Sequence, residues 1–197
     1  ASDVYKRQLY DIPMLSNIPN LVYLAPATKE EYLSMLDWAI EQSKYPVAVR
    51  VPGGAVILDG KEVKSDWSDI NKYEITKSGS VIALGTFYQL GEKAASLIEE
   101  KTGTAPTLIN PHYITGIDKD TLEDLKKNHD VVITLEDGIL DGGFGEKIAR
   151  FYGNSDVKTL CFGLENKFYD RYDVNELMRE AHLTPEQIAD DTIALLK

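Results

Sequence analysis

VVITLEDGILDGGFGEKIARF, residues 131–151, is the stretch of this chain that decides its fold. It opens with β-branched and aliphatic residues that predict a buried strand over 131–136. After Gly142 and Gly143, apolar residues return at helical spacing, which predicts a helix directly behind the glycine turn. A buried strand that leads through a short turn into a helix is the building unit of α/β proteins.

The same alternation of strand and helix runs from residue 80 to the C-terminus. Further strands are predicted at 80–85, 107–110 and 157–163. An apolar stripe over 90–98 and the capping residues Asp118 and Thr184 mark helices. Such an alternation forms a mostly parallel sheet with helices on both faces. We therefore expect an α/β fold with a complete doubly wound domain over residues 80–197.

A smaller α/β unit precedes this domain. Residues 21–26 and 47–51 predict strands, and Thr28 with Glu31 forms a capping box that starts a helix between them. Strands joined by such a helix pair in parallel. Because two strands cannot make a stable domain alone, residues 9–52 are expected to be the end of a domain whose other strands are missing from this sequence.

Because neighbouring strands are missing from this sequence, we expect side chains on the two strands of the smaller unit to be exposed. The residues expected on unpaired strand edges or uncovered faces are Leu21, Tyr23, Val47 and Val49. Residues 53–79 are polar and weakly periodic, which predicts an interdomain linker with short β pieces at 55–58 and 73–76. Residues 1–8 fit neither unit and form an atypical leader.

Charge and composition argue against several functions. The 197 residues carry a formal net charge of −11, which repels phosphates and argues against nucleic acid as a general partner. No apolar run approaches the ~20 residues of a membrane span, and the N-terminus lacks the apolar core of a signal peptide. We therefore expect a cytoplasmic protein without a membrane partner.

Residues that carry self-contained chemistry are sparse. The single cysteine, Cys161, lies in an apolar run and is expected to be a buried structural thiol. The histidines lack metal-ligand spacing, so no metal site is predicted; they are His112, His129 and His182. G-x-S-x-G, P-loop and complete G-x-G-x-x-G motifs are absent. The sequence therefore predicts no catalytic residue in this chain.

Candidate site residues lie at the glycine turn and just before it. The turn with Gly142, Gly143 and Gly145 could present backbone N–H groups to an anion, or it could be a tight turn in which glycine permits close packing. Glu136 and Asp137 close the predicted strand at the carboxyl edge, where α/β sheets place their sites. They could act as acid and base, cap the turn or meet a partner subunit.

Arg50 is the candidate for substrate binding. It lies at the end of the strand over 47–51. A guanidinium there could hold a phosphate or carboxylate through two hydrogen bonds. A structural ion pair across the junction between the two domains is the alternative.

Several segments resemble the 1-deoxy-D-xylulose-5-phosphate synthases, a family of transketolase-like enzymes. LYDIPMLSNIPNLVYLAP (9–26), KEEYLSMLDWAIE (29–41) and PVAVRVPGG (46–54) are similar to the end of the pyrimidine-binding domain, a thiamine-binding fold, in that family. VVITLEDGILDGGFGEKIARF is similar to the transketolase C-terminal domain. The order and spacing agree over residues 9–197.

The resemblance implies a transferase that uses thiamine diphosphate to join pyruvate with glyceraldehyde 3-phosphate for isoprenoid biosynthesis, with loss of carbon dioxide. In this family, thiamine diphosphate and magnesium bind an N-terminal domain, and the activating glutamate lies early in the middle domain. Both lie upstream of residue 1, which implies that this chain alone binds no cofactor and is inactive. Its implied partners are the N-terminal cofactor domain and a second copy, in a homodimer.

Two departures from the family pattern matter. Where the family has Thr-His-Gln-Gly before the Tyr-Asp pair, residues 5–8 are Tyr-Lys-Arg-Gln. Where the family has Tyr-Pro-Arg-Gly, whose arginine holds the substrate phosphate, this chain has Gly53 in place of the arginine. The acceptor substrate is therefore open. Arg50 matches a family arginine to which the resemblance assigns no role.

Two other functions remain open. The chain could be the C-terminal subunit of a split transketolase or a 2-oxo acid dehydrogenase beta-type chain, active with a separate N-terminal chain. It could also be a non-catalytic interaction or dimerisation module that reuses the fold. Fold analogy does not decide between them, whereas the reading frame upstream of residue 9 would.

Overall fold

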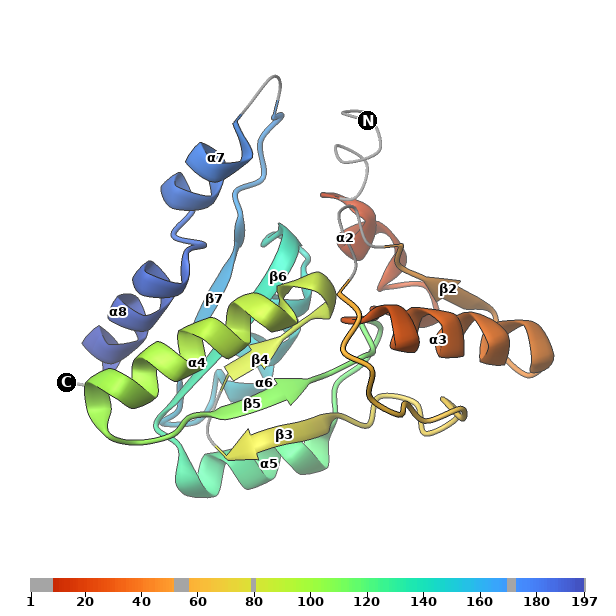
Figure 1. Ribbon diagram of the computed structural model, residues 1–197, viewed down its shortest axis with the longest axis horizontal. Coiled ribbons are helices and arrows are strands. Elements are labelled where there is room, and N and C mark those ends of the chain that lie inside the picture. The colour runs from red at the N-terminus through yellow and green to blue at the C-terminus, as the bar shows by residue number, and fades with distance from the viewer. Residues whose placement is uncertain (1–8, 52–56, 79–80, 170–172, 197) are drawn as a thin grey trace.

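A five-stranded sheet forms the centre of the larger part of the molecule. The computed structural model describes residues 9–51, 57–78, 81–169 and 173–196 (Figure 1). The strand order is β3-β5-β4-β6-β7. The strands are β3 (Glu74–Ser78), β4 (Val81–Ala83), β5 (Thr107–Asn110), β6 (Val131–Ile139) and β7 (Lys158–Leu164). Neighbours pair in parallel except β3, which runs antiparallel to β5. This confirms the predicted α/β class with a mostly parallel sheet.

Helices cover both faces of this sheet, as a doubly wound domain requires. They are η1 (Gly85–Phe87), α4 (Tyr88–Thr102), α5 (Lys119–Asn128), α6 (Phe144–Tyr152), α7 (Val174–Glu180) and α8 (Pro185–Leu195). One buried apolar cluster joins the sheet to α4, α7 and α8, and the other joins it to α5 and α6. Successive side chains of β4 enter different clusters: Val81 lies in the first and Ile82 in the second. Burial on two faces explains why the strands are continuously apolar.

The N-terminal unit has the predicted strand–helix–strand order. Its elements are α2 (Asp11–Leu15), β1 (Val22–Leu24), α3 (Lys29–Glu41) and β2 (Val47–Val49). β1 and β2 pair in parallel, and the Thr28 side chain caps α3 by accepting a hydrogen bond from the Glu31 N–H. The short helix α2 was not predicted, because Pro13 and Asn17 are typical of turns. A proline is nevertheless compatible with the first turn of a helix.

The expectation that β1 has an open edge and an uncovered face is wrong. Tyr23 is buried in the same cluster as Ile82 of the larger sheet. The Ile114 N–H donates to the Tyr23 carbonyl, and the Ala25 N–H donates to the His112 carbonyl. The segment that follows β5 therefore occupies the second edge of β1. Val47 of β2 stays partly exposed.

Residues 57–73 were predicted to be a linker, and Trp67 anchors this largely exposed segment on the N-terminal unit. Trp67 is 1% exposed and shares a buried cluster with Met35 and Tyr113. Its indole N–H donates to the Ser34 hydroxyl at 3.1 Å. Residues 74–78, which were also placed in the predicted linker, form β3 at the edge of the sheet. This segment therefore covers α3 before it joins the sheet.

β6 is longer than predicted, and its last part is irregular. The sequence places the strand end at 136, whereas β6 continues to Ile139. Its pairing with β7 shifts register between Leu135 and Ile139. Glu136 and Asp137 therefore lie inside an irregular part of the strand and not at its end. This irregularity lets the two neighbouring side chains reach different partners.

Candidate functional site

A buried ion network lies where the N-terminal unit meets the sheet. The Arg50 side chain is 7% exposed. Its Nε donates to Asp11 Oδ2 at 2.9 Å, and Nη1 pairs with Asp137 Oδ1. Nη2 also donates to the Asp137 carbonyl at 3.3 Å. Arg50 directly follows β2, so its guanidinium joins the end of β2 to α2 and to β6.

Two hydroxyl groups complete this network. The Tyr23 hydroxyl donates to Asp11 Oδ2 at 2.9 Å, and the Thr86 hydroxyl donates to Asp137 Oδ2 at 2.8 Å. Thr86 lies in η1, so the network also fixes the start of the segment that leads into α4. Asp11 Oδ1 is buried and accepts no hydrogen bond within the described ranges. That oxygen keeps capacity for one further donor.

The network determines the charge states of its members. Burial alone would lower the pKa of Arg50, but the charges of Asp137 and Asp11 outweigh it and raise that pKa. Burial, and then the charge of Asp11, raises the pKa of the Tyr23 hydroxyl. Arg50 is therefore a permanent cation and Tyr23 a neutral donor. The predicted ion pair across the junction is present, and a role of Arg50 in substrate binding stays a prediction.

Glu136 occupies the position at which the glycine turn could have held an external anion. Its Oε2 accepts from the Phe144 N–H and its Oε1 from the Gly145 N–H, both at 2.8 Å. These groups begin α6, where the helix dipole favours a negative charge. The Gly142 N–H donates to Glu146 Oε2 at 2.8 Å. The Gly143 N–H donates to the Leu140 carbonyl at 2.9 Å, so the backbone donors of the turn are engaged by the chain's own carboxylates and by one carbonyl.

The glycines permit this close approach. A Cβ atom on Gly143 would lie 2.6 Å from Glu136 Oε2 and 2.8 Å from the Ile139 carbonyl oxygen. On Gly145 it would lie 2.5 Å from Thr134 Oγ1. Gly142 has φ of 71°, in the left-handed region that favours glycine. The geometry thus favours the close-packing explanation of the glycine turn.

The electrostatics of Glu136 differ from those of an exposed carboxylate. Burial raises its pKa to about 7, although the Gly145 and Phe144 N–H groups oppose that effect. The neighbouring charge of Asp137 raises it further and Arg50 lowers it. Glu136 faces α6 while Asp137 faces Arg50 and Thr86. The two predicted carboxylates are adjacent in sequence but serve different partners.

A second polar cluster escaped the sequence analysis. Glu31 Oε1 lies 3.1 Å from Asn110 Nδ2 and 3.2 Å from His112 Nε2. Burial alone would raise the pKa of Glu31, but the hydrogen bond and charge of His112 outweigh it and lower that pKa. A cavity of about 450 Å³ opens above Glu31 and Asn110. The capping box pointed to Glu31, but no sequence pattern linked it to residues 110–112.

Among the described residues, the remaining candidate side chains do not come together in a catalytic or metal-binding site. Gly53 lies outside the described residues. Cys161 is partly buried in β7, and burial raises the pKa of its thiol. In the part of the chain that the structure describes, no group of three or more His, Cys, Asp or Glu side chains could hold a metal ion. None of the helices in those ranges is long and apolar enough to cross a membrane.

A family model and the sequences of known proteins identify the same group of relatives. Residues 74–188 match the family model of the transketolase C-terminal domain. The 1-deoxy-D-xylulose-5-phosphate synthase of Shouchella clausii (strain KSM-K16) is 32% identical, over 95% of this chain and 31% of the relative. That of Clostridium botulinum (strain Alaska E43 / Type E3) is 34% identical, over 92% of this chain and 30% of the relative. The chain therefore spans about a third of the length of these relatives. The resemblance predicted from the motifs is confirmed.

A solved structure shares the fold. The chain superposes with a TM-score of 0.76 and 18% identity on a protein described as a split gene transketolase, an inactive beta4 tetramer. The match covers 96% of this chain and 62% of that chain. It therefore includes the N-terminal unit as well as the larger sheet.

Replacing Gly143 with alanine should destabilise the protein by about 2 kcal/mol, because the new methyl group would force Glu136 and the Ile139 carbonyl apart. Urea denaturation measures the free energy of unfolding. Gly153→Ala is the matched control, since its Cβ would meet nothing closer than 3.5 Å and its φ of −56° suits alanine. Equal stability of the two variants would contradict the close-packing explanation.

Stability should also depend on pH through Glu136. Its folded pKa of about 7 exceeds the ordinary value of 4.5, so the unfolded chain releases this proton first as pH rises. The contribution of Glu136 to stability is therefore complete below about pH 4.5 and is lost as pH rises through about 7. Relative to Glu136→Gln, the wild-type protein should lose up to roughly 3 kcal/mol between pH 4.5 and 8.

The control for this pH series is Glu99→Gln, which removes an exposed carboxylate from α4. Its stability should stay parallel to that of the wild-type protein across the range. A constant difference between wild type and Glu136→Gln would show that folding does not raise the pKa of Glu136.

Proposed function

The chain belongs to the transketolase C-terminal domain family, and on that premise we propose that it forms the C-terminal part of a 1-deoxy-D-xylulose-5-phosphate synthase. One observation carries the proposal. Similarity to these synthases extends over 95% of the chain, so it includes the N-terminal unit, which lies before the family-model match at residues 74–188. A shared C-terminal domain alone would not produce similarity over the preceding residues.

In this proposal the complete enzyme is a cytoplasmic homodimer that condenses pyruvate with glyceraldehyde 3-phosphate and releases carbon dioxide. Thiamine diphosphate, with magnesium, supplies the carbanion chemistry when it is bound. The chain described here supplies a wall of the site and a surface for the second subunit. Its Arg50 network holds the N-terminal unit against the sheet, which fixes the position of that wall.

The glycine turn does not fit the diphosphate of the cofactor. Its natural place would be the turn at the start of α6, but the Phe144 and Gly145 N–H groups there already bind Glu136. A diphosphate at that turn would meet a buried carboxylate, which repels it when ionised. We therefore assign cofactor binding to the N-terminal part of the enzyme and none to this chain.

A split transketolase is the second candidate, and one observation favours it. The protein of similar fold is described as a split gene transketolase. At 18% identity that likeness concerns the fold. The two candidates differ in whether this chain works in the same polypeptide as the cofactor domain, and in which substrates the assembled enzyme accepts.

A chimeric enzyme tests the proposal. Residues 9–197 are joined to the N-terminal portion of the Shouchella clausii synthase, at the position where the two sequences align. We expect release of carbon dioxide from pyruvate that depends on glyceraldehyde 3-phosphate, because the N-terminal portion brings the cofactor site and this chain completes it. Nuclear magnetic resonance spectroscopy of the products identifies the sugar phosphate formed.

Two comparisons make this test decisive. The N-terminal portion alone should be inactive, and the unaltered Shouchella clausii enzyme sets the full rate. A folded chimera that binds thiamine diphosphate but transfers ketol groups between sugar phosphates, without consuming pyruvate, would favour the transketolase candidate and contradict our proposal.

The acceptor specificity should depend on position 53. Because Gly53 replaces the arginine with which the family holds the substrate phosphate, Gly53→Arg in the chimera should lower the KM for glyceraldehyde 3-phosphate by about tenfold, as expected for one charged hydrogen bond. The KM for unphosphorylated glyceraldehyde should not change. Steady-state kinetics with both acceptors measures this difference.

Gly54→Arg is the matched control, because it adds the same charge one residue later. It should leave both KM values within about twofold. An equal decrease for both variants would mean that general electrostatic attraction, and not a specific contact at position 53, governs acceptor binding.

A further inference from the structure

A groove where the N-terminal unit meets the larger part of the molecule is lined by more basic than acidic side chains. It lies between the end of α2, the segment from β5 to α5, and the start of α6, and has a volume of about 420 Å³. Lys119, Lys147 and Arg150 line it together with a single acid, Glu146. The resulting net charge of +2 stands out on a chain whose total is −11. We call this feature the basic groove.

The cations of the basic groove form no ion pairs with carboxylates among the described residues. Within the described ranges, no Asp or Glu oxygen lies within 4.0 Å of the charged nitrogens of Lys119, Lys147 or Arg150. Glu146 is held elsewhere, since its Oε2 accepts from the Gly142 N–H at 2.8 Å. The Lys119 and Arg150 side chains are exposed. They can therefore turn toward an incoming anion.

Lys147 provides a fixed charge on the floor of the groove. Its Nζ lies 3.2 Å from the Ser16 carbonyl, 3.1 Å from that of Ile114 and 3.4 Å from that of Thr115. These acceptors use all three ammonium hydrogens, so Lys147 contributes its charge and not a hydrogen bond to a ligand. The same contacts tie α2 and the segment after β5 to α6.

Two hydroxyl groups in the groove lack partners. Ser16 is 4% exposed, and its Oγ has no hydrogen-bond partner among the described residues; the same holds for Thr115 Oγ1. Both residues line the groove. Buried hydroxyls without a partner are rare in folded proteins. Both hydroxyl oxygens are buried at the groove wall, and a side-chain rotation would turn either donor toward an oxyanion held by the cations.

We propose that the basic groove binds a phosphate group, either free or as the monoester of a small metabolite. Arg150 can hold two phosphate oxygens at once, Lys119 adds a second mobile cation, and the Ser16 and Thr115 hydroxyls donate to the remaining oxygens. The volume is within the range of small-molecule sites. Nucleic acid phosphates are excluded as the ligand, because the rest of the surface is strongly acidic.

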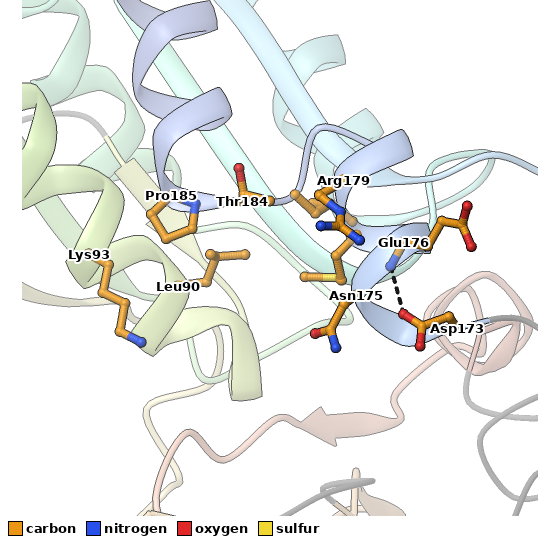
Figure 2. Close-up of a pocket in the computed structure, with 10 residues that line it drawn as sticks. Leu90, Lys93, Asp173, Asn175, Glu176, Arg179, Thr184 and Pro185 are labelled. Carbon is orange, nitrogen blue, oxygen red and sulfur yellow. Dashed lines mark hydrogen bonds between the residues drawn. The ribbon is translucent and has the colours of Figure 1, made fainter.

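A second groove provides an internal comparison. Figure 2 shows Lys93 on α4 and Arg179 on α7, which line a larger cavity of about 940 Å³. Asp173 and Glu176 line the same cavity, so its charges balance. Asp173 is also the N-cap of α7, since it accepts from the Glu176 N–H at 2.9 Å. This groove has as many acids as cations and should not bind phosphate.

The test is a titration of the isotope-labelled chain with inorganic phosphate at constant ionic strength, followed by backbone amide resonances. We expect saturable shifts at Thr115, Gly116, Gly142 and Gly143, with a dissociation constant of about 1–5 mM. Constant ionic strength removes general screening effects. Linear shifts that do not saturate, or shifts spread evenly over the surface, would overturn the proposal.

Variants separate a built site from general attraction. Lys119→Gln combined with Arg150→Gln should weaken phosphate binding by about tenfold or more. Lys93→Gln combined with Arg179→Gln removes the same charge from the comparison groove and should change the affinity by less than about twofold. Equal weakening in both double variants would contradict a specific site. The dispersion of the amide spectrum verifies that each variant is folded.

A second ligand distinguishes the two sources of the phosphate group. Equal affinity for inorganic phosphate and glycerol 3-phosphate would assign the groove to free phosphate. Tighter binding of glycerol 3-phosphate would assign it to a metabolite monoester. Ser16→Ala should weaken either ligand by about threefold, as expected for the loss of one hydrogen bond. An unchanged affinity in Ser16→Ala and in the Lys119/Arg150 double variant would exclude the groove as the binding site.

Discussion

The guanidinium of Arg50, buried between Asp11 and Asp137, joins the N-terminal unit to the sheet through a buried ion network. It connects side chains that lie 39 and 87 residues away in the sequence. Removing one member of such a buried network leaves an uncompensated charge, which typically costs about 3–5 kcal/mol. The Thr86 hydroxyl satisfies Asp137 Oδ2, and the Tyr23 hydroxyl adds a second hydrogen bond to Asp11 Oδ2. α2, β2 and β6 are therefore held together as one unit.

The irregular end of β6 makes this arrangement possible. Glu136 reaches the N–H groups at the start of α6, while Asp137 reaches Arg50 and Thr86. Two carboxylates side by side would repel each other if both faced the same apolar space. Each instead has its own donors, a helix terminus in one case and a guanidinium in the other. The strand end thereby stabilises both the glycine turn and the junction with the N-terminal unit.

Local patterns predicted the elements, and long-range pairing could not be predicted from them. The alternation of apolar strands and capped helices gave the parallel sheet and the strand–helix–strand unit, because periodicity and capping act within a few residues. Arg50 and Asp137 were both singled out, but nothing in the sequence paired one with the other or with Asp11. The hydrogen bonds between β1 and residues 112–114 were missed for the same reason. Their partners are set by the folded surfaces and not by neighbours in the chain.

The glycine turn shows how one local feature directs binding elsewhere. The Glu136 carboxylate accepts hydrogen bonds from the backbone N–H groups of Phe144 and Gly145 at the positive end of α6. These N–H groups are therefore unavailable to a ligand at the surface. Gly142 and Gly143 nevertheless line the basic groove on that outer side. An anion there has to be held by side chains, and these are the ones that carry uncompensated charge. Burial lowers the pKa of the partly buried Lys147, and the charge of Glu136 opposes that effect. The same carboxylate that completes the turn thus acts on one of the three cations that a ligand in the groove would meet.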